Sequence, residues 1–232
     1  MFGSRLEVKQ FEDCILKYEA QPIAEGKILF YGSSTFTRCS FIYTERHPEK
    51  GHPLLEEAVR MKDGSQAIVN HGFGTSSADD LLYYYDRMVR PYKPRALVIY
   101  TGGNDMAFGY QPEEIMNILA TMIDWFQADF PGAPVYCMTQ VPQFKKVGLR
   151  DRSIRLRDEL NQLLEGYCAA KEGIKAIRMV DCPVYFEKPE DVGDYDKAWE
   201  EVFDADKGHL NAFGYGRFMD FFRDYLEKEG LL

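Results

Sequence analysis

The chain has 232 residues, of which 45% are apolar and 28% charged, and its formal net charge is −9. This length and composition are typical of a soluble globular protein with a sizeable core, and they predict a single domain over residues 1–232. The acidic balance argues against a nucleic-acid partner, because phosphate binding needs clustered lysine and arginine.

The N-terminal region shows no apolar core of a signal peptide, and no stretch approaches the roughly 18 apolar residues of a membrane span. The five cysteines are scattered, without a Cys-x-x-Cys pair, so the sequence predicts neither a disulfide framework nor a zinc site. We therefore expect a cytoplasmic protein with free thiols, no membrane partner, no bound metal and no cofactor.

Short apolar runs alternate with longer amphipathic segments along the chain. Strands are predicted at 27–31, 66–70, 96–100, 135–139 and, more weakly, 175–180. Helices are predicted at 7–20, 76–90, 112–128, 151–172 and 211–229. The stretches 43–65 and 183–208 are predicted to be irregular, and loops of that length are often functional. The alternation predicts an α/β fold with a parallel sheet and helices on both faces.

Polar, mostly glycine-bearing turns follow the first three predicted strands. They read Gly32-Ser33-Ser34-Thr35, Asn70-His71-Gly72-Phe73-Gly74-Thr75 and Thr101-Gly102-Gly103-Asn104-Asp105. A fourth polar segment, Asp206-Lys207-Gly208-His209, precedes the last helix. Because ligands bind outside the carboxyl ends of parallel strands, we expect these four segments to converge at one edge of the sheet.

These segments together hold the groups that acyl transfer needs. Ser34 is a candidate nucleophile, and a serine hydroxyl is weak until a base removes its proton. His209 is the candidate base, and Asp206, three residues earlier, suits a turn that lets the carboxylate orient the ring. Asp204 competes for this role, with the spacing favouring Asp206.

Donors for a developing oxyanion are also present at the same edge. The candidates are the backbone N–H of Ser34, the N–H of Gly74 or Thr75, and the side-chain amide of Asn104. The residues alone leave open whether Gly74 or Thr75 donates.

At this point the chain resembles the SGNH hydrolases, also called GDSL-type lipases and esterases. The resemblance runs from the strand before Ser34 to the helix after His209, and it rests on the four segments in this order. Ser33 stands where the family usually has aspartate. Thr75 follows Gly74 where many relatives have two glycines, and we expect Thr75 to donate only if its φ is negative. The resemblance implies a three-layer, flavodoxin-like fold with a five-stranded sheet.

The resemblance also implies a serine esterase that hydrolyses a small carboxylic ester. A short acyl chain is expected, for example on an acetylated sugar. Two alternatives stay open: an acyltransferase that uses the same triad with an acceptor other than water, and a non-catalytic carbohydrate-binding protein on this scaffold.

Other polar residues have structural explanations. Ser34 could cap the helix after the first strand, and Asn104 could be a turn residue. Asp105 is predicted to bond neighbouring backbone amides. Among the other histidines, His71 is a weak candidate for substrate contact, whereas two in the charged loop, His47 and His52, are expected to be solvated.

Overall fold

The computed structural model describes residues 9–140, 151–186, 201–206 and 208–232. Its centre is a five-stranded parallel sheet in the order β2-β1-β3-β4-β5. The strands are β1 (Ile28–Gly32), β2 (Ile68–Gly72), β3 (Ala96–Tyr100), β4 (Val135–Met138) and β5 (Ile174–Ile177). This order is the flavodoxin-like one, so the predicted fold class is confirmed.

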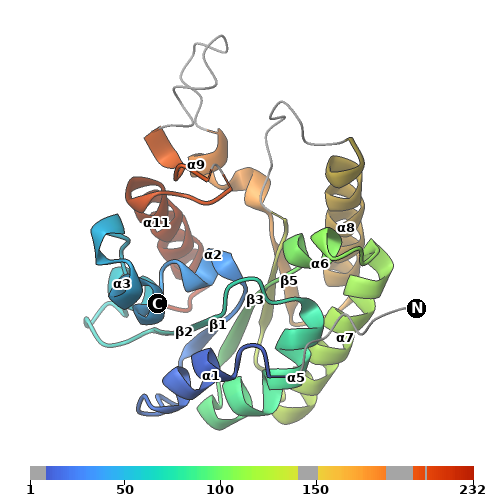
Figure 1. Ribbon diagram of the computed structural model, residues 1–232. Coiled ribbons are helices and arrows are strands. Elements are labelled where there is room, and N and C mark those ends of the chain that lie inside the picture. Colours follow the sequence, from blue (N-terminus) through green and yellow to red (C-terminus); the bar gives the residue numbers. More distant parts are fainter. Residues whose placement is uncertain (1–8, 141–150, 187–200, 207) are drawn as a thin grey trace.

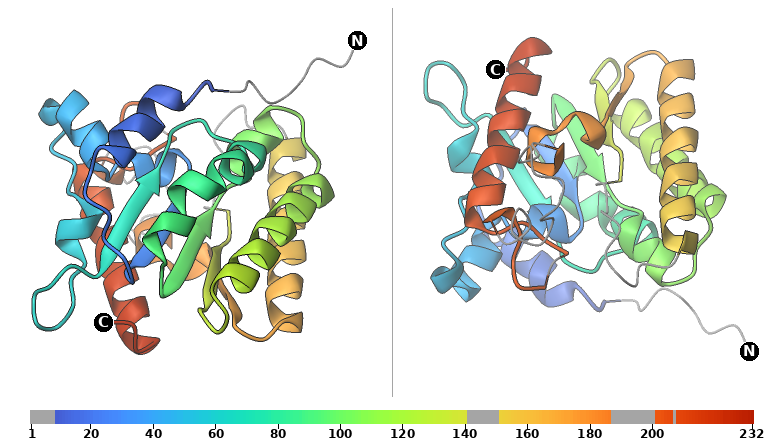
Figure 2. Two further views of the ribbon diagram at one scale, coloured as in Figure 1. Left: turned by 90° about the horizontal axis from the view of Figure 1, so that it is seen from below. Right: turned by 90° about the horizontal axis from the view of Figure 1, so that it is seen from above.

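Helices cover both faces of the sheet (Figure 1). One face carries α1 (Glu12–Glu19), α5 (Ala78–Met88), α7 (Pro112–Asp129) and α8 (Asp151–Ala170). The other face carries α2 (Ser34–Thr37), α4 (Leu55–Ala58), α9 (Pro183–Phe186) and α11 (Ala212–Lys228). Figure 2 shows α11 on one side of the sheet and α7 and α8 on the other. The result is the predicted three-layer arrangement.

Strand β1 illustrates why the sheet is buried on both sides. Leu29 and Tyr31 pack into the core beneath α5 and α7, whereas Ile28 and Phe30 pack beneath α2 and α11. Successive side chains of a strand point to opposite faces, so a continuous apolar run supplies two cores at once.

Two helices that flank the site begin at side-chain caps. Before α5, the Ser77 hydroxyl accepts from the Asp80 N–H, and the Asp80 carboxylate accepts from the Ser77 N–H. Before α11, Asn211 Oδ1 accepts from the Gly214 N–H at 2.9 Å. Such caps satisfy N–H groups that have no partner within the helix, and they fix where each helix starts relative to the sheet edge.

In the described ranges no helix combines the length and apolar character that a bilayer crossing requires.

The stretch 43–65 differs from the prediction. It is not irregular throughout, because it contains the end of α3 (Phe41–Arg46), a 3-10 turn (Pro48–Lys50) and α4. Ile42 in α3 and Leu55 in α4 are buried. Helices this short are held by one buried side chain each and leave little periodicity in the sequence. Within 183–208, the structure places α9, and residues 187–200 and 207 lie outside the described part.

Strand β2 lies at one edge of the sheet, and side chains cover its outward backbone groups. Glu56 Oε1 accepts from the Asn70 N–H at 2.9 Å, and the Tyr18 hydroxyl donates to the Gly72 carbonyl at 2.6 Å. Unpaired strand edges are templates for another strand. Here, α1 and α4 close this edge.

Gly72 is pressed against the backbone of α2. An added Cβ would lie 2.3 Å from the Thr37 nitrogen and 2.5 Å from the Phe36 carbonyl carbon. We expect Gly72→Ala to lower the free energy of unfolding by about 2–3 kcal/mol or more, because backbone atoms cannot rotate away. Urea unfolding measures it. Gly216→Ala in α11 is the control, since its Cβ meets nothing within 4 Å, and it should be neutral or stabilise by up to about 1 kcal/mol. Equal effects of the two variants would contradict the predicted close contact.

Candidate active site

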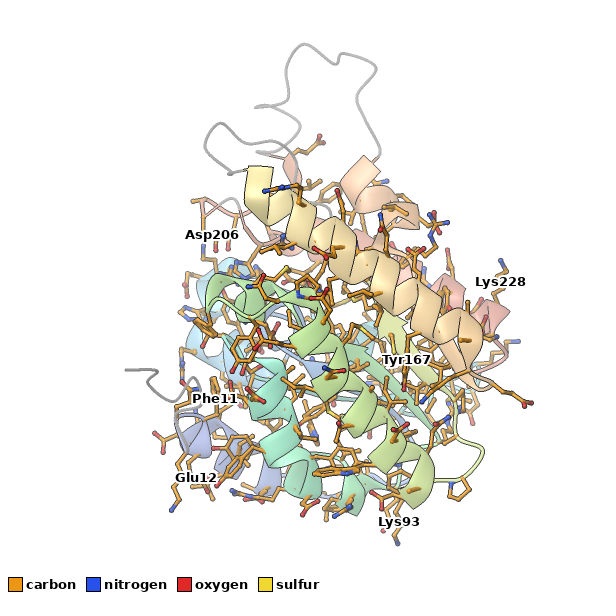
Figure 3. The ribbon with its side chains drawn as sticks, turned by 90° about the vertical axis from the view of Figure 1, so that its right-hand side faces the viewer. Phe11, Glu12, Lys93, Tyr167, Asp206 and Lys228 are labelled. Atoms are coloured by element: carbon orange, nitrogen blue, oxygen red, sulfur yellow. The ribbon has the colours of Figure 1, made fainter. Side chains whose placement is uncertain are left out.

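The predicted site segments meet at the carboxyl end of the sheet. Figure 3 places Asp206 and Lys93 at opposite ends of the molecule. Lys93 comes three residues before β3 begins, so it marks the amino end of the strands and Asp206 lies at the other end. Ser34 follows β1 and Asn104 follows β3, the two strands at which the chain order of the sheet reverses. In parallel α/β sheets, a crevice forms at this position.

Ser34, His209 and Asp206 form one hydrogen-bonded series. His209 Nε2 lies 2.9 Å from Ser34 Oγ, and His209 Nδ1 lies 2.9 Å from Asp206 Oδ2. A carboxylate can only accept, so Nδ1 carries the proton and Nε2 is left to accept from the serine hydroxyl. This is the relation between nucleophile, base and orienting acid that serine hydrolases use.

The chain leaves β1 through a glycine that admits no side chain. A Cβ on Gly32 would lie 2.4 Å from the carbonyl oxygen of Tyr100. Ser33 takes the N-cap position of α2, so Ser34 is the first residue of the helix. The Ser34 hydroxyl bonds His209, and the alternative of a capping serine therefore does not describe it.

The loop that carries Asp206 and His209 is held at both ends. The Asp204 N–H donates to the His209 carbonyl at 2.8 Å, and the Asn211 N–H donates to the Val202 carbonyl at 2.9 Å. Within the loop, Asp206 Oδ1 accepts from the Gly208 N–H at 3.0 Å and the His209 N–H at 3.1 Å. The carboxylate is thus oriented by the turn itself.

Asp204 has different partners from Asp206. Its carboxylate bonds Arg38 Nη1 at 3.0 Å and Lys50 Nζ at 2.9 Å. The acid that contacts the histidine ring is Asp206, as the three-residue spacing favours.

The surroundings shift both titratable groups of the series. Burial lowers the pKa of His209 below its ordinary value, the Arg38 charge adds to this, and Asp206 opposes it. Burial by itself would raise the pKa of Asp206, but the Gly208 N–H, His209 and Arg38 outweigh it and lower that pKa to about 2. Around neutral pH, the carboxylate is therefore ionised and the imidazole is available as a neutral base.

Besides the N–H of Ser34, the candidate oxyanion donors come from the turns after β2 and β3. A Cβ built on Gly74 would lie 3.9 Å from Ser34 Cβ. Thr75 has a φ of 66°. The negative φ that a donor role for Thr75 requires is therefore absent. Asn104 lies near the start of α6 (Gly103–Ala107), and its Nδ2 donates to the Ser76 carbonyl at 3.0 Å. That bond ties the turn after β3 to the turn after β2.

Asp105 holds this pair of turns in place. Its buried carboxylate accepts from the Thr101 hydroxyl at 2.9 Å and the Gly102 N–H at 2.9 Å, and from the Ala78 N–H at 2.6 Å. The predicted structural role of Asp105 is confirmed, and its bonds join the turn after β3 to the start of α5.

The remaining histidines are structural or peripheral. His71 is buried, its Nδ1 donates to the Met88 carbonyl at 2.8 Å, and burial lowers its pKa to about 4. It is a core group rather than a substrate contact. The expectation for His52 was wrong, because it is only 7% exposed and lies between the rings of Tyr43 and Tyr215. His47 is half-exposed.

Arg38 is a site residue that the sequence analysis missed. Its Nη2 donates to Asp206 Oδ2 at 2.6 Å. The available signal was its spacing, since it lies four residues after Ser34 in a helical segment and positions i and i+4 share a face. Within the described part of the chain, no group of three or more histidine, cysteine, aspartate or glutamate side chains has the arrangement of a metal site.

Comparisons with known proteins identify the family of the chain and relatives of its fold. The sequence model of the GDSL-like Lipase/Acylhydrolase family matches residues 30–217. No protein among the curated sequences matches the chain.

Solved structures with the same fold share little sequence with the chain. A GDSL-like lipase from Bacteroides thetaiotaomicron has a TM-score of 0.65 at 18% identity, over 96% of this chain and 100% of that one. The psychrotrophic esterase EstA from Pseudoalteromonas sp. has a TM-score of 0.60 at 13% identity, over 88% and 98%. A variant of an acetyl-xylooligosaccharide esterase from Geobacillus stearmophilus has a TM-score of 0.58 at 16% identity, over 89% and 95%.

Thr75 occupies a backbone conformation that favours glycine. We expect Thr75→Gly to raise the free energy of unfolding by about 1 kcal/mol, because a β-branched residue at positive φ is strained. Urea unfolding measures the change. Thr75→Ala keeps a Cβ at the same φ and serves as the control, with a smaller gain expected. A glycine variant no more stable than the alanine variant would show that this strain is negligible.

Proposed function

Since this chain belongs to the GDSL-like Lipase/Acylhydrolase family of ester-bond hydrolases, we propose that Ser34, His209 and Asp206 are its catalytic triad. The observation that carries the proposal is the unbroken series from Ser34 Oγ to His209 Nε2 and from His209 Nδ1 to Asp206, with both distances 2.9 Å. The pKa of about 2 for Asp206 supports its part as a permanently ionised partner.

In the acylation step, Ser34 Oγ attacks the ester carbonyl carbon while His209 Nε2 takes the hydroxyl proton. Asp206 accepts from Nδ1 throughout and stabilises the imidazolium that forms. The tetrahedral intermediate then collapses, the bond to the alcohol oxygen breaks, and His209 gives its proton to the leaving alcohol. In deacylation, water attacks the carbonyl carbon of the acyl-enzyme while His209 takes its proton. The bond to Ser34 Oγ then breaks, His209 returns the proton to Oγ, and the acid is released.

The oxyanion of the intermediate needs preorganised donors. We propose the N–H groups of Ser34 and Gly74 and the side-chain amide of Asn104. The proximity of Gly74 to Ser34 and the positive φ of Thr75 favour Gly74 over Thr75 in this role. One N–H of Asn104 Nδ2 donates to the Ser76 carbonyl, and the second N–H of the same nitrogen is the proposed oxyanion donor.

For the substrate, we propose a small neutral ester with a short acyl chain, such as an acetylated sugar. The structural neighbours include proteins named as an acetyl-xylooligosaccharide esterase and a family 3 carbohydrate esterase. The net charge of −9 disfavours anionic substrates. Transfer of the acyl group to a sugar hydroxyl in place of water uses the same steps up to the acyl-enzyme, and product analysis with sugar acceptors distinguishes the two outcomes.

Removing the nucleophile tests the proposed function. We expect Ser34→Ala to lower kcat on p-nitrophenyl acetate and acetylated oligosaccharides by about 10⁴-fold or more. Ser33→Ala is the matched control, since the neighbouring hydroxyl does not cap α2, and it should keep most of the activity. Full activity in Ser34→Ala would rule out the triad. If the wild type hydrolysed none of the acetyl esters, the carbohydrate-binding alternative would be favoured.

Asn104→Ala tests the oxyanion donor. Because the proposed bond to the oxyanion forms in the transition state, we expect kcat to fall by about 10²–10³-fold with little change in KM. A melting curve controls for loss of the Ser76 bond. A rise in KM at unchanged kcat would instead place Asn104 in ground-state binding.

A further inference from the structure

Arg38 joins the helix of the nucleophile to the loop of the base. Its backbone N–H donates to the Ser34 carbonyl at 3.1 Å, within the single turn of α2. Its guanidinium forks, with Nη1 3.0 Å from Asp204 Oδ2 and Nη2 2.6 Å from Asp206 Oδ2. The side chain is only 17% exposed. One residue therefore bonds the nucleophile's own turn and two carboxylates of the Asp206/His209 loop.

The bond to Asp206 falls on the atom that His209 uses. Asp206 Oδ2 lies 2.9 Å from His209 Nδ1 and 2.6 Å from Arg38 Nη2, while Oδ1 accepts the two backbone N–H groups. The carboxylate is thus held by four donors and cannot rotate without losing several of them. Arg38 also places a permanent positive charge beside Asp206 and His209.

Arg38 is itself braced by the segment that begins in α3. His52 Nδ1 donates to the Arg38 carbonyl at 2.9 Å, and the guanidinium lies 5.4 Å from the centre of the Tyr43 ring. Tyr43 stacks in turn on His52. Lys50 bonds the other oxygen of Asp204 at 2.9 Å. These contacts fix the guanidinium on the side that faces away from the Asp206/His209 loop.

We propose that Arg38 is a positioning residue that holds Asp206 against His209 and keeps His209 in its neutral, proton-accepting form as the pH falls. The proposal rests on the proposed function of the triad. In the described part of the chain, the charged or titratable groups facing the pair are Arg38, Asp204 and, through Asp204, Lys50, with His52 behind Arg38.

The sign of the effect follows from the charge of Arg38. This charge disfavours the imidazolium, so its loss raises the pKa of His209. In the variant, the base is therefore protonated, and inactive, at a higher pH than in the wild type.

The test is the pH profile of kcat/KM for Arg38→Met on p-nitrophenyl acetate. We expect the acidic limb to move to higher pH by about 0.5–1 pH unit. At a pH on the acidic limb, this shift lowers kcat/KM by about 3–10-fold relative to the wild type, in addition to any fall in the plateau. A lower plateau with little change in KM is also expected, since Asp206 is less well fixed. Arg87→Met is the matched control, because Arg87 also bridges two carboxylates, Glu12 and Glu19, but on α1.

Arg87→Met should lower the melting temperature and leave the limb unmoved. Arg38→Lys keeps the charge without the fork, so its limb should stay near that of the wild type while its plateau falls; it also serves if the methionine variant does not fold. An unmoved limb in Arg38→Met, with Ser34→Ala inactive, would overturn the positioning role and leave the triad intact. Activity in Ser34→Ala would overturn the triad itself.

Discussion

The site depends on the close contact between α2 and the carboxyl ends of β1 and β2. Gly32 and Gly72 sit in the same register on these strands, and each leaves less room than one Cβ would need. A four-residue helix has too few internal hydrogen bonds to hold itself. Its position is set by this contact and by the burial of Phe36 in the core. Ser34 and Arg38 are fixed because the turn between them is pressed onto the sheet.

From that turn, polar bonds lead outward to the rest of the site. The Arg38 guanidinium reaches the loop before α11, and His209 returns from that loop to Ser34. On the other side, Asn104 and Asp105 join the turns after β2 and β3. The site is therefore a ring of segments distant in sequence, each anchored to a strand end or a helix start. Such anchoring suits chemistry that needs reacting groups held within fractions of an ångström.

The sequence predicted the parts of the molecule that have strong local signals. The five strands and the long helices follow from hydrophobic period, and glycine-bearing turns marked where Ser34 and Asn104 would lie. What it missed depends on tertiary contacts. The burial of His52 comes from the rings of Tyr43 and Tyr215 around it.

The contacts of the two acids likewise appear only in three dimensions. Spacing favoured Asp206, and in the folded chain Asp206 contacts the histidine ring whereas Asp204 bonds Arg38 and Lys50. The donor turn shows the same limit, because the left-handed φ of Thr75 is a property of the folded chain that no residue pattern announces.

The side chains that cover β2 also bear on how molecules of this protein meet one another. With Glu56 on the Asn70 N–H and Tyr18 on the Gly72 carbonyl, an incoming strand would have to displace a carboxylate and a phenol before forming its first bonds. The sheet is thus closed to growth on this side, and crowding of many copies would not readily turn this edge into the start of a fibril.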